Sequence, residues 1–194
     1  MSEFSQSDGK KLLKAARDSV VAYFEGKSFK LSGFPQKRGV FVTIHSHPSH
    51  ALRGCIGFPE PIFSVNDGLP KAAVYAAFQD PRFNPLAKGE LSKVIFEVSI
   101  LTEPELVKVK KPGDYFSKIK VGVDGLIVEK GYARGLLLPI VAGGYGWSAE
   151  QFLEETCSKA GLSDDSWEDV KNCKVFKFQA QVFSEKKPIR SEWI

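Results

Sequence analysis

Two alternating apolar segments joined by a short polar turn place the strongest constraint on the fold of this chain. In residues 40–45, the apolar side chains of Val40, Val42 and Ile44 alternate with those of residues 41, 43 and 45, as in a strand with one buried face. Residues 51–57 form a second such segment, and Pro48 lies in the polar turn of residues 46–50 between them. A turn this short joins antiparallel strands, so the sequence predicts a β-hairpin.

Apolar periodicity and capping signals predict further helices and strands. Helices are expected at residues 7–25, about 66–78, 112–119 and 149–160, and strands at residues 93–101, 126–129, 134–138 and 175–183. Asn66 or Asp67 is the expected N-cap of the second helix, which would place Pro70 in its first turn. Residues 143–146 are interpreted as a flexible loop.

The order of these elements favours an α+β fold with a mainly antiparallel sheet and flanking helices. Strands and helices mix without the regular βαβ rhythm of a parallel sheet. The length of 194 residues fits one domain, residues 1–194, with two subdomains in one compact unit. The basic tail, residues 185–194, is expected to lie on the surface.

Composition indicates a cytoplasmic protein with no membrane segment. Three separated cysteines without a paired spacing are expected to be free thiols. No apolar run reaches the roughly 18 residues that cross a bilayer. The net charge of +4 is spread along the chain, which favours a solvated surface over a nucleic-acid-binding one.

Several ordered sequence blocks resemble those of the AMMECR family. The hexapeptide of residues 52–57, Leu-Arg-Gly-Cys-Ile-Gly, looks like the family signature. Further similar blocks follow in the expected order: residues 77–83, 97–101, 125–128, 136–139 and 157–162, and Trp167. The resemblance covers about residues 10–185. Two features depart from the family pattern, namely Ile140 in place of a glutamine and the glycine-rich stretch of residues 143–146.

The resemblance implies a two-subdomain α+β fold without a settled biochemical activity. It likens the chain to protein A of the AmmeMemoRadiSam system. Family association then implies Memo-like and radical S-adenosylmethionine proteins as partners, and animal relatives have been proposed to regulate nucleic-acid transactions. No cofactor follows from the sequence.

Arg53 and Cys55 are the first candidates for a catalytic site. In an extended strand they project from the same face, and a guanidinium beside a thiol favours the thiolate that attacks electrophiles. Gly54 and Gly57 leave the backbone open to close approach by a ligand or by another part of the chain, which makes them candidate binding positions. The alternative is structural, because unpaired cysteines are often buried and strand glycines often serve packing.

Charged and imidazole side chains supply further candidates. Glu97 interrupts an apolar strand, so it is either paired, for instance with Arg53 or Arg82, or a carboxylate of the site. Asp80 and Arg82 flank a proline; they either pair locally or line the same cleft as candidate binding residues. His45 and His47 are weak candidates for a metal site, because no second cysteine or carboxylate pair lies at ligand spacing.

Two hypotheses of function therefore stand together. In the first, the chain is an enzyme or an enzyme-associated component of a modification pathway, with Cys55, Arg53 and Glu97 at its centre. In the second, it is a non-catalytic module that binds protein or nucleic acid through the Arg53 surface, and Cys55 serves packing.

Overall fold

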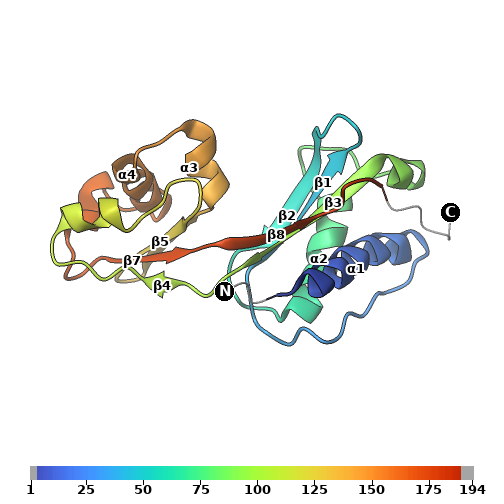
Figure 1. Ribbon diagram of the computed structural model, residues 1–194, viewed down its shortest axis with the longest axis horizontal. Helices are drawn as coiled ribbons and strands as arrows, with labels where there is room; N and C mark the ends of the chain where they lie inside the picture. Colours follow the sequence, from blue (N-terminus) through green and yellow to red (C-terminus); the bar gives the residue numbers. More distant parts are fainter. Residues whose placement is uncertain (1–3, 189–194) are drawn as a thin grey trace. The chain divides into compact units, whose positions relative to one another are not determined.

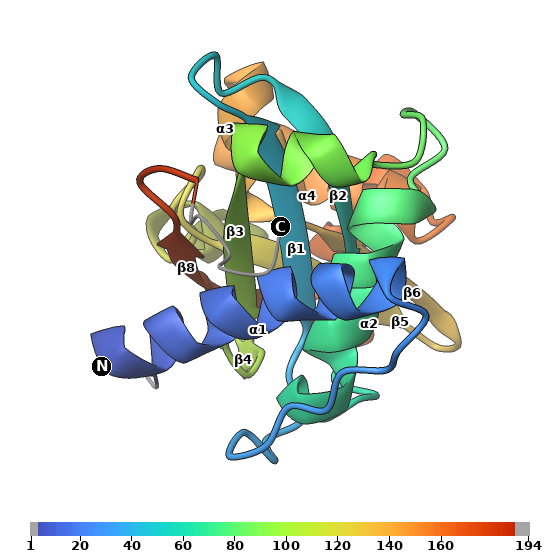
Figure 2. The same cartoon turned by 90° about the vertical axis from the view of Figure 1, so that its right-hand side faces the viewer.

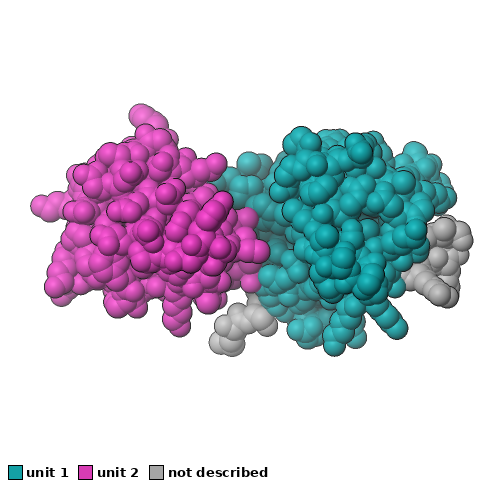
Figure 3. Space-filling model, turned by 90° about the horizontal axis from the view of Figure 1, so that it is seen from above, with its two compact units in different colours: residues 1–101, 181–194 teal, residues 102–180 magenta. Residues whose placement is uncertain are grey.

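The backbone divides into two compact units. A computed structural model describes residues 4–188. Unit 1 contains residues 1–101 and 181–194, and unit 2 contains residues 102–180 (Figure 3). Unit 2 is therefore one continuous stretch inserted between two separate stretches of unit 1.

Unit 1 is a four-stranded sheet with two helices on one face. The strands lie in the order β2 (Leu52–Phe58), β1 (Val40–Ser46), β3 (Val94–Leu101) and β8 (Ala180–Ser184) (Figure 1). Helices α1 (Gln6–Phe24) and α2 (Val65–Phe78) pack against the sheet, and Figure 2 shows them on the same side of it. The short 3-10 helix η1 (Lys88–Lys93) leads into β3.

The predicted hairpin is confirmed as β1 and β2, which pair antiparallel. Val40, Val42 and Ile44 are fully buried against the helices, as the alternation predicts. A bulge shifts the register between Ile44 and His45. Leu52 lies beyond that bulge and is exposed.

Capping explains where the helices of unit 1 begin. Ser5 caps α1, and its hydroxyl accepts from the Asp8 N–H while the Asp8 carboxylate accepts from the Ser5 N–H. The N-cap of α2 is Ser64 and not Asn66 or Asp67, so that prediction is wrong. Pro70 consequently lies inside α2, beyond its first turn.

A buried ion pair joins α1 to the segment that follows β8. The guanidinium of Arg17 donates to both carboxylate oxygens of Glu185, at 3.0 and 2.6 Å, and both side chains are at most 3% exposed. Arg17 also donates to the backbone oxygens of Leu91 and Val94, and Glu185 accepts from the Phe96 N–H. The tail predicted to lie on the surface thus begins with a buried residue, and residues 189–194 lie outside the described part.

Unit 2 has its own antiparallel sheet and its own core. The strands lie in the order β4 (Glu105–Leu106), β7 (Lys174–Phe178), β5 (Gly125–Lys130) and β6 (Ala133–Leu137). The helical elements are η2 (Pro112–Ser117), α3 (Pro139–Tyr145), α4 (Ala149–Lys159) and η3 (Asp164–Glu168). Phe152 and Leu153 of α4 are fully buried with Leu126 and Val175 of the sheet. The α+β class with mainly antiparallel pairing is confirmed.

Two predictions fail in unit 2. Residues 175–183 are not one strand, because β7 ends at Phe178 and β8 begins at Ala180 in the sheet of unit 1. Gln179 lies at the break, where its N–H donates to the Thr102 hydroxyl and its carbonyl accepts from the Thr102 N–H. The expected loop of residues 143–146 is largely helical, since α3 begins at Pro139 and ends in Gly146 at a φ of 66°.

Two of the three cysteines are buried in unit 2. Cys157 and Cys173 are free thiols in the core of unit 2. The hydrogen bond between them and the burial of Cys157 raise the pKa of the Cys157 thiol, so it stays protonated. Within residues 4–188, every helix is too short or too polar to cross a bilayer.

Candidate functional site

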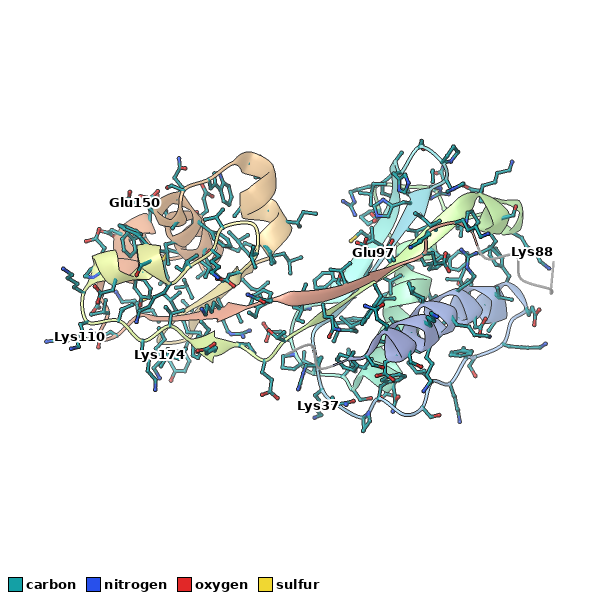
Figure 4. The ribbon with its side chains drawn as sticks, in the orientation of Figure 1. Lys37, Lys88, Glu97, Lys110, Glu150 and Lys174 are labelled. Atoms are coloured by element: carbon teal, nitrogen blue, oxygen red, sulfur yellow. The ribbon has the colours of Figure 1, made fainter. Side chains whose placement is uncertain are left out.

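Three polar residues form a row across the sheet of unit 1. Thr43 of β1 lies between Cys55 of β2 and Glu97 of β3 in the strand register. They lie on the sheet face opposite the buried valines, because successive side chains alternate between faces. Two strand spacings separate Cys55 from Glu97, or about 10 Å between backbones. Figure 4 shows Glu97 on the side of the sheet away from α1.

Cys55 is half-buried and is held through both its side chain and its backbone. The Thr43 hydroxyl donates a hydrogen bond to the Cys55 sulfur at 3.3 Å. The Cys55 N–H donates to Asp80 Oδ2 at 2.8 Å, and its carbonyl accepts from Arg82 Nη2 at 3.2 Å. Since β2 is an edge strand, Asp80 and Arg82 together satisfy the backbone groups that a further strand would otherwise bind.

Asp80 and Arg82 form a local ion pair at the end of α2. The Asp80 side chain is 2% exposed and accepts from Arg82 Nε at 2.9 Å and from Arg82 Nη2 at 2.7 Å. These bonds hold the pKa of the Asp80 carboxyl well below its ordinary value; burial opposes the effect, and the Cys55 N–H adds to it. The same hydrogen bonds raise the pKa of Arg82, to which the negative charge of a Cys55 thiolate also contributes.

Arg53 is bound by partners from η1 and from the loop that precedes it. Its guanidinium donates to both carboxylate oxygens of Glu90, at 2.9 and 3.1 Å, and to the backbone oxygen of Asn84 at 2.9 Å. Those side-chain bonds lower the pKa of Glu90, against the opposing effect of burial. Arg53 therefore joins β2 to η1 and to the loop before it, and its side chain is only 16% exposed.

Glu97 does not pair with Arg53 or with Arg82, which was one of its two expected roles. The carboxylate partner of Arg53 is Glu90, and that of Arg82 is Asp80. In the part of the chain that the structure describes, the half-buried Glu97 has no ion pair within 4.0 Å. It stays a candidate carboxylate of the site.

The two glycines of β2 are approached closely by the protein's own atoms. A Cβ built on Gly54 would lie 2.1 Å from the Ala76 backbone oxygen of α2. One built on Gly57 would lie 2.3 Å from the ring of Phe41. Gly54 therefore sets how closely β2 and α2 can pack.

Gly54→Ala is expected to lower the free energy of unfolding of unit 1 by about 2 kcal/mol, because α2 must move away from β2. Gly89→Ala is the matched control, since nothing lies within 4 Å of its added methyl group. Chemical denaturation followed by circular dichroism measures both. Equal losses in the two variants would contradict the packing argument.

The histidines lie at the turn end of the hairpin. His45 lies near the end of β1, and its Nδ1 atom is 3.3 Å from the His50 carbonyl oxygen. His47 lies just after β1. Over residues 4–188, no group of three or more histidine, cysteine or acidic side chains is placed to hold a metal ion.

Comparison with known proteins places this geometry in a family. The AMMECR1 family model matches residues 13–183. The chain belongs to the AMMECR1 family. Uncharacterised archaeal members of the family are similar over almost their whole length. A Methanocaldococcus jannaschii protein is 45% identical, with 93% of this chain and 92% of the relative covered. A Methanothermobacter thermautotrophicus protein is 49% identical, with 93% and 96% covered.

A solved AMMECR1-type structure has the same fold. The crystal structure of an uncharacterized protein from Pyrococcus horikoshii is 46% identical to this chain. Its TM-score is 0.75, with 93% of this chain and 92% of that chain covered. The resemblance read from the hexapeptide and the later blocks is thus confirmed.

Two residues of the candidate site are not predicted from the sequence. Thr43 carries no signal of its own in the sequence, and only the hairpin register places it opposite Cys55. Glu90 carried no signal in the sequence, because 37 positions separate it from Arg53.

Proposed function

We propose that this AMMECR1 protein is an enzyme, or an enzyme-associated component of a modification pathway, whose reactive atom is the Cys55 sulfur. The observation that carries the proposal is the row of Cys55, Thr43 and Glu97, with Arg82 beside the cysteine. Cys157 and Cys173 differ from Cys55, because both are fully buried in the core of unit 2.

Each neighbour of Cys55 has a separate role in the proposal. Thr43 donates to the sulfur and so orients it, while the positive charge of Arg82 attracts a thiolate. Asp80 fixes the backbone of the cysteine. Glu97 lies two strands away, where it can exchange a proton with a substrate that spans Thr43. Arg53 is a positioning residue in this arrangement, because its guanidinium is already bound to Glu90.

Thiol alkylation of the folded protein tests the proposal directly. The other two cysteines are buried, so labelling by iodoacetamide reports on Cys55. We expect one equivalent of label, incorporated about tenfold faster at neutral pH than into a model thiol. Cys55→Ser should abolish the rapid labelling.

Two variants separate the contributions of the neighbours. Arg82→Gln and Thr43→Val should each slow labelling towards the rate of a model thiol, because they remove the charge and the hydroxyl beside the sulfur. Lys88→Gln is the control, a cation of unit 1 that lies in η1. A native rate no higher than that of the model thiol would refute the reactive-cysteine proposal and leave the binding-module alternative.

A further inference from the structure

Unit 2 contains a hollow in which four of the eight lining residues are lysines. Its volume is about 470 Å³, and Lys108, Lys118, Lys120 and Lys177 contribute to its wall together with Ser117. The residues come from β4 and the segment after it, from η2 and the segment after it, and from β7. This hollow, the lysine pocket, lies entirely within residues 105–177 and so does not involve Cys55.

The four lysines of the pocket outnumber the one carboxylate that lines it. Among residues 4–188, none of its four ammonium groups lies within 4.0 Å of an acidic side chain. Lys118 instead donates to the Lys108 carbonyl at 2.5 Å, and Lys177 donates to the Lys118 carbonyl at 3.2 Å. Ammonium groups gathered in this way repel one another, and a bound anion relieves that repulsion.

Fewer carboxylates than ammonium groups line the lysine pocket. Glu105 is the one acidic residue lining the pocket, and it lies opposite Lys177 in the strand register without forming an ion pair with it. Figure 4 shows Glu150 on α4, and Lys110 and Lys174 on the side of β4 and β7. Four lysines against one carboxylate give the pocket lining a net positive charge, which attracts anions.

We propose that the lysine pocket binds a small phosphate-bearing molecule. A volume of about 470 Å³ lies within the range of small-ligand sites. Ammonium groups serve as compact point charges for phosphate, and the Ser117 hydroxyl adds a neutral donor. The lining contains no aromatic ring on which a nucleic-acid base would stack, which argues against a single-stranded nucleic acid.

Calorimetric titration of the full-length chain with tripolyphosphate, at low ionic strength, tests this proposal. We expect saturable binding at one site and at least tenfold weaker binding of sulfate. Lys120→Gln should weaken tripolyphosphate binding about tenfold, because it removes a cation from the pocket. Within the described residues, the Lys120 ammonium group makes no hydrogen bond that this variant would break. Glu105→Gln should strengthen binding, because it removes the carboxylate that repels the anion.

Lys174→Gln is the matched control. It removes the same charge from the same strand, but three positions from Lys177 and hence on the other sheet face. The affinity of Lys174→Gln for tripolyphosphate should stay within about twofold of that of the wild type. Absence of saturable binding would overturn the proposal, as would equal weakening in Lys120→Gln and Lys174→Gln. Tighter binding of a single-stranded DNA oligonucleotide that displaces tripolyphosphate would assign the surface to nucleic acid instead.

Discussion

Arg17→Ala is expected to lower the free energy of unfolding of unit 1 by about 3–5 kcal/mol. The substitution leaves the Glu185 carboxylate buried beneath the sheet without its cation. It also removes the donors to the Leu91 and Val94 carbonyls and the contact of the guanidinium with the Phe96 ring at 4.7 Å. Lys14→Ala on the same helix is the control, because Lys14 and Asp18 form an exposed pair worth a small fraction of that energy.

The measurement has to report on unit 1. Trp147 and Trp167 lie in unit 2, so their fluorescence follows that unit. Amide hydrogen exchange of β1 follows unit 1 directly. Arg17→Met combined with Glu185→Leu removes both charges together and should restore much of the lost stability. An Arg17→Ala variant as stable as the wild type would show that the ion pair contributes little to stability.

Asp80→Asn is expected to cost about 3 kcal/mol of stability at neutral pH, because a carboxylate inside the fold loses its charge-assisted bonds. The amide can keep only some of the four contacts that Asp80 makes with Arg82 and with the Cys55 N–H. Urea denaturation measures the loss. The same variant should also change the rate of Cys55 alkylation, because it frees the backbone of that residue.

The difference between wild type and Asp80→Asn should depend on pH. The folded-state pKa of Asp80 is lowered, so its contribution is fully present above the unfolded-state value of about 4. It is lost as the pH falls below that value towards the folded-state pKa. Asp18→Asn, on the surface, is the control. A stability difference that stays constant as the pH falls would show that charge is not the cause.

Local signals in the sequence predicted most of the fold. Alternation and a short turn predicted the β1–β2 hairpin, and the Ser148 capping box predicted the start of α4. The break at Gln179 was not predictable from alternation, because that pattern does not say which sheet a strand joins. Helix α3 was missed because its glycines disfavour a helix, although Pro139 at its start and Gly146 at its end are ordinary boundary signals.

The candidate site was predictable only in part. Sequence spacing placed Arg53 and Cys55 on one face of a strand, but it could not show that Arg53 binds Glu90. Partners far apart in sequence are set by tertiary packing, as Arg17 and Glu185 also show. The row of Cys55, Thr43 and Glu97 needed the register of three strands.

The insertion of unit 2 has a consequence for the order of events during translation. The ribosome must synthesise all of residues 102–180 before β8 can join the sheet begun by β1, β2 and β3. Until Glu185 emerges, the guanidinium of Arg17 has no carboxylate to meet it. A nascent chain that stops before this point lacks the partner that Arg17 needs inside unit 1, so its first unit is expected to be less stable than that of a finished chain.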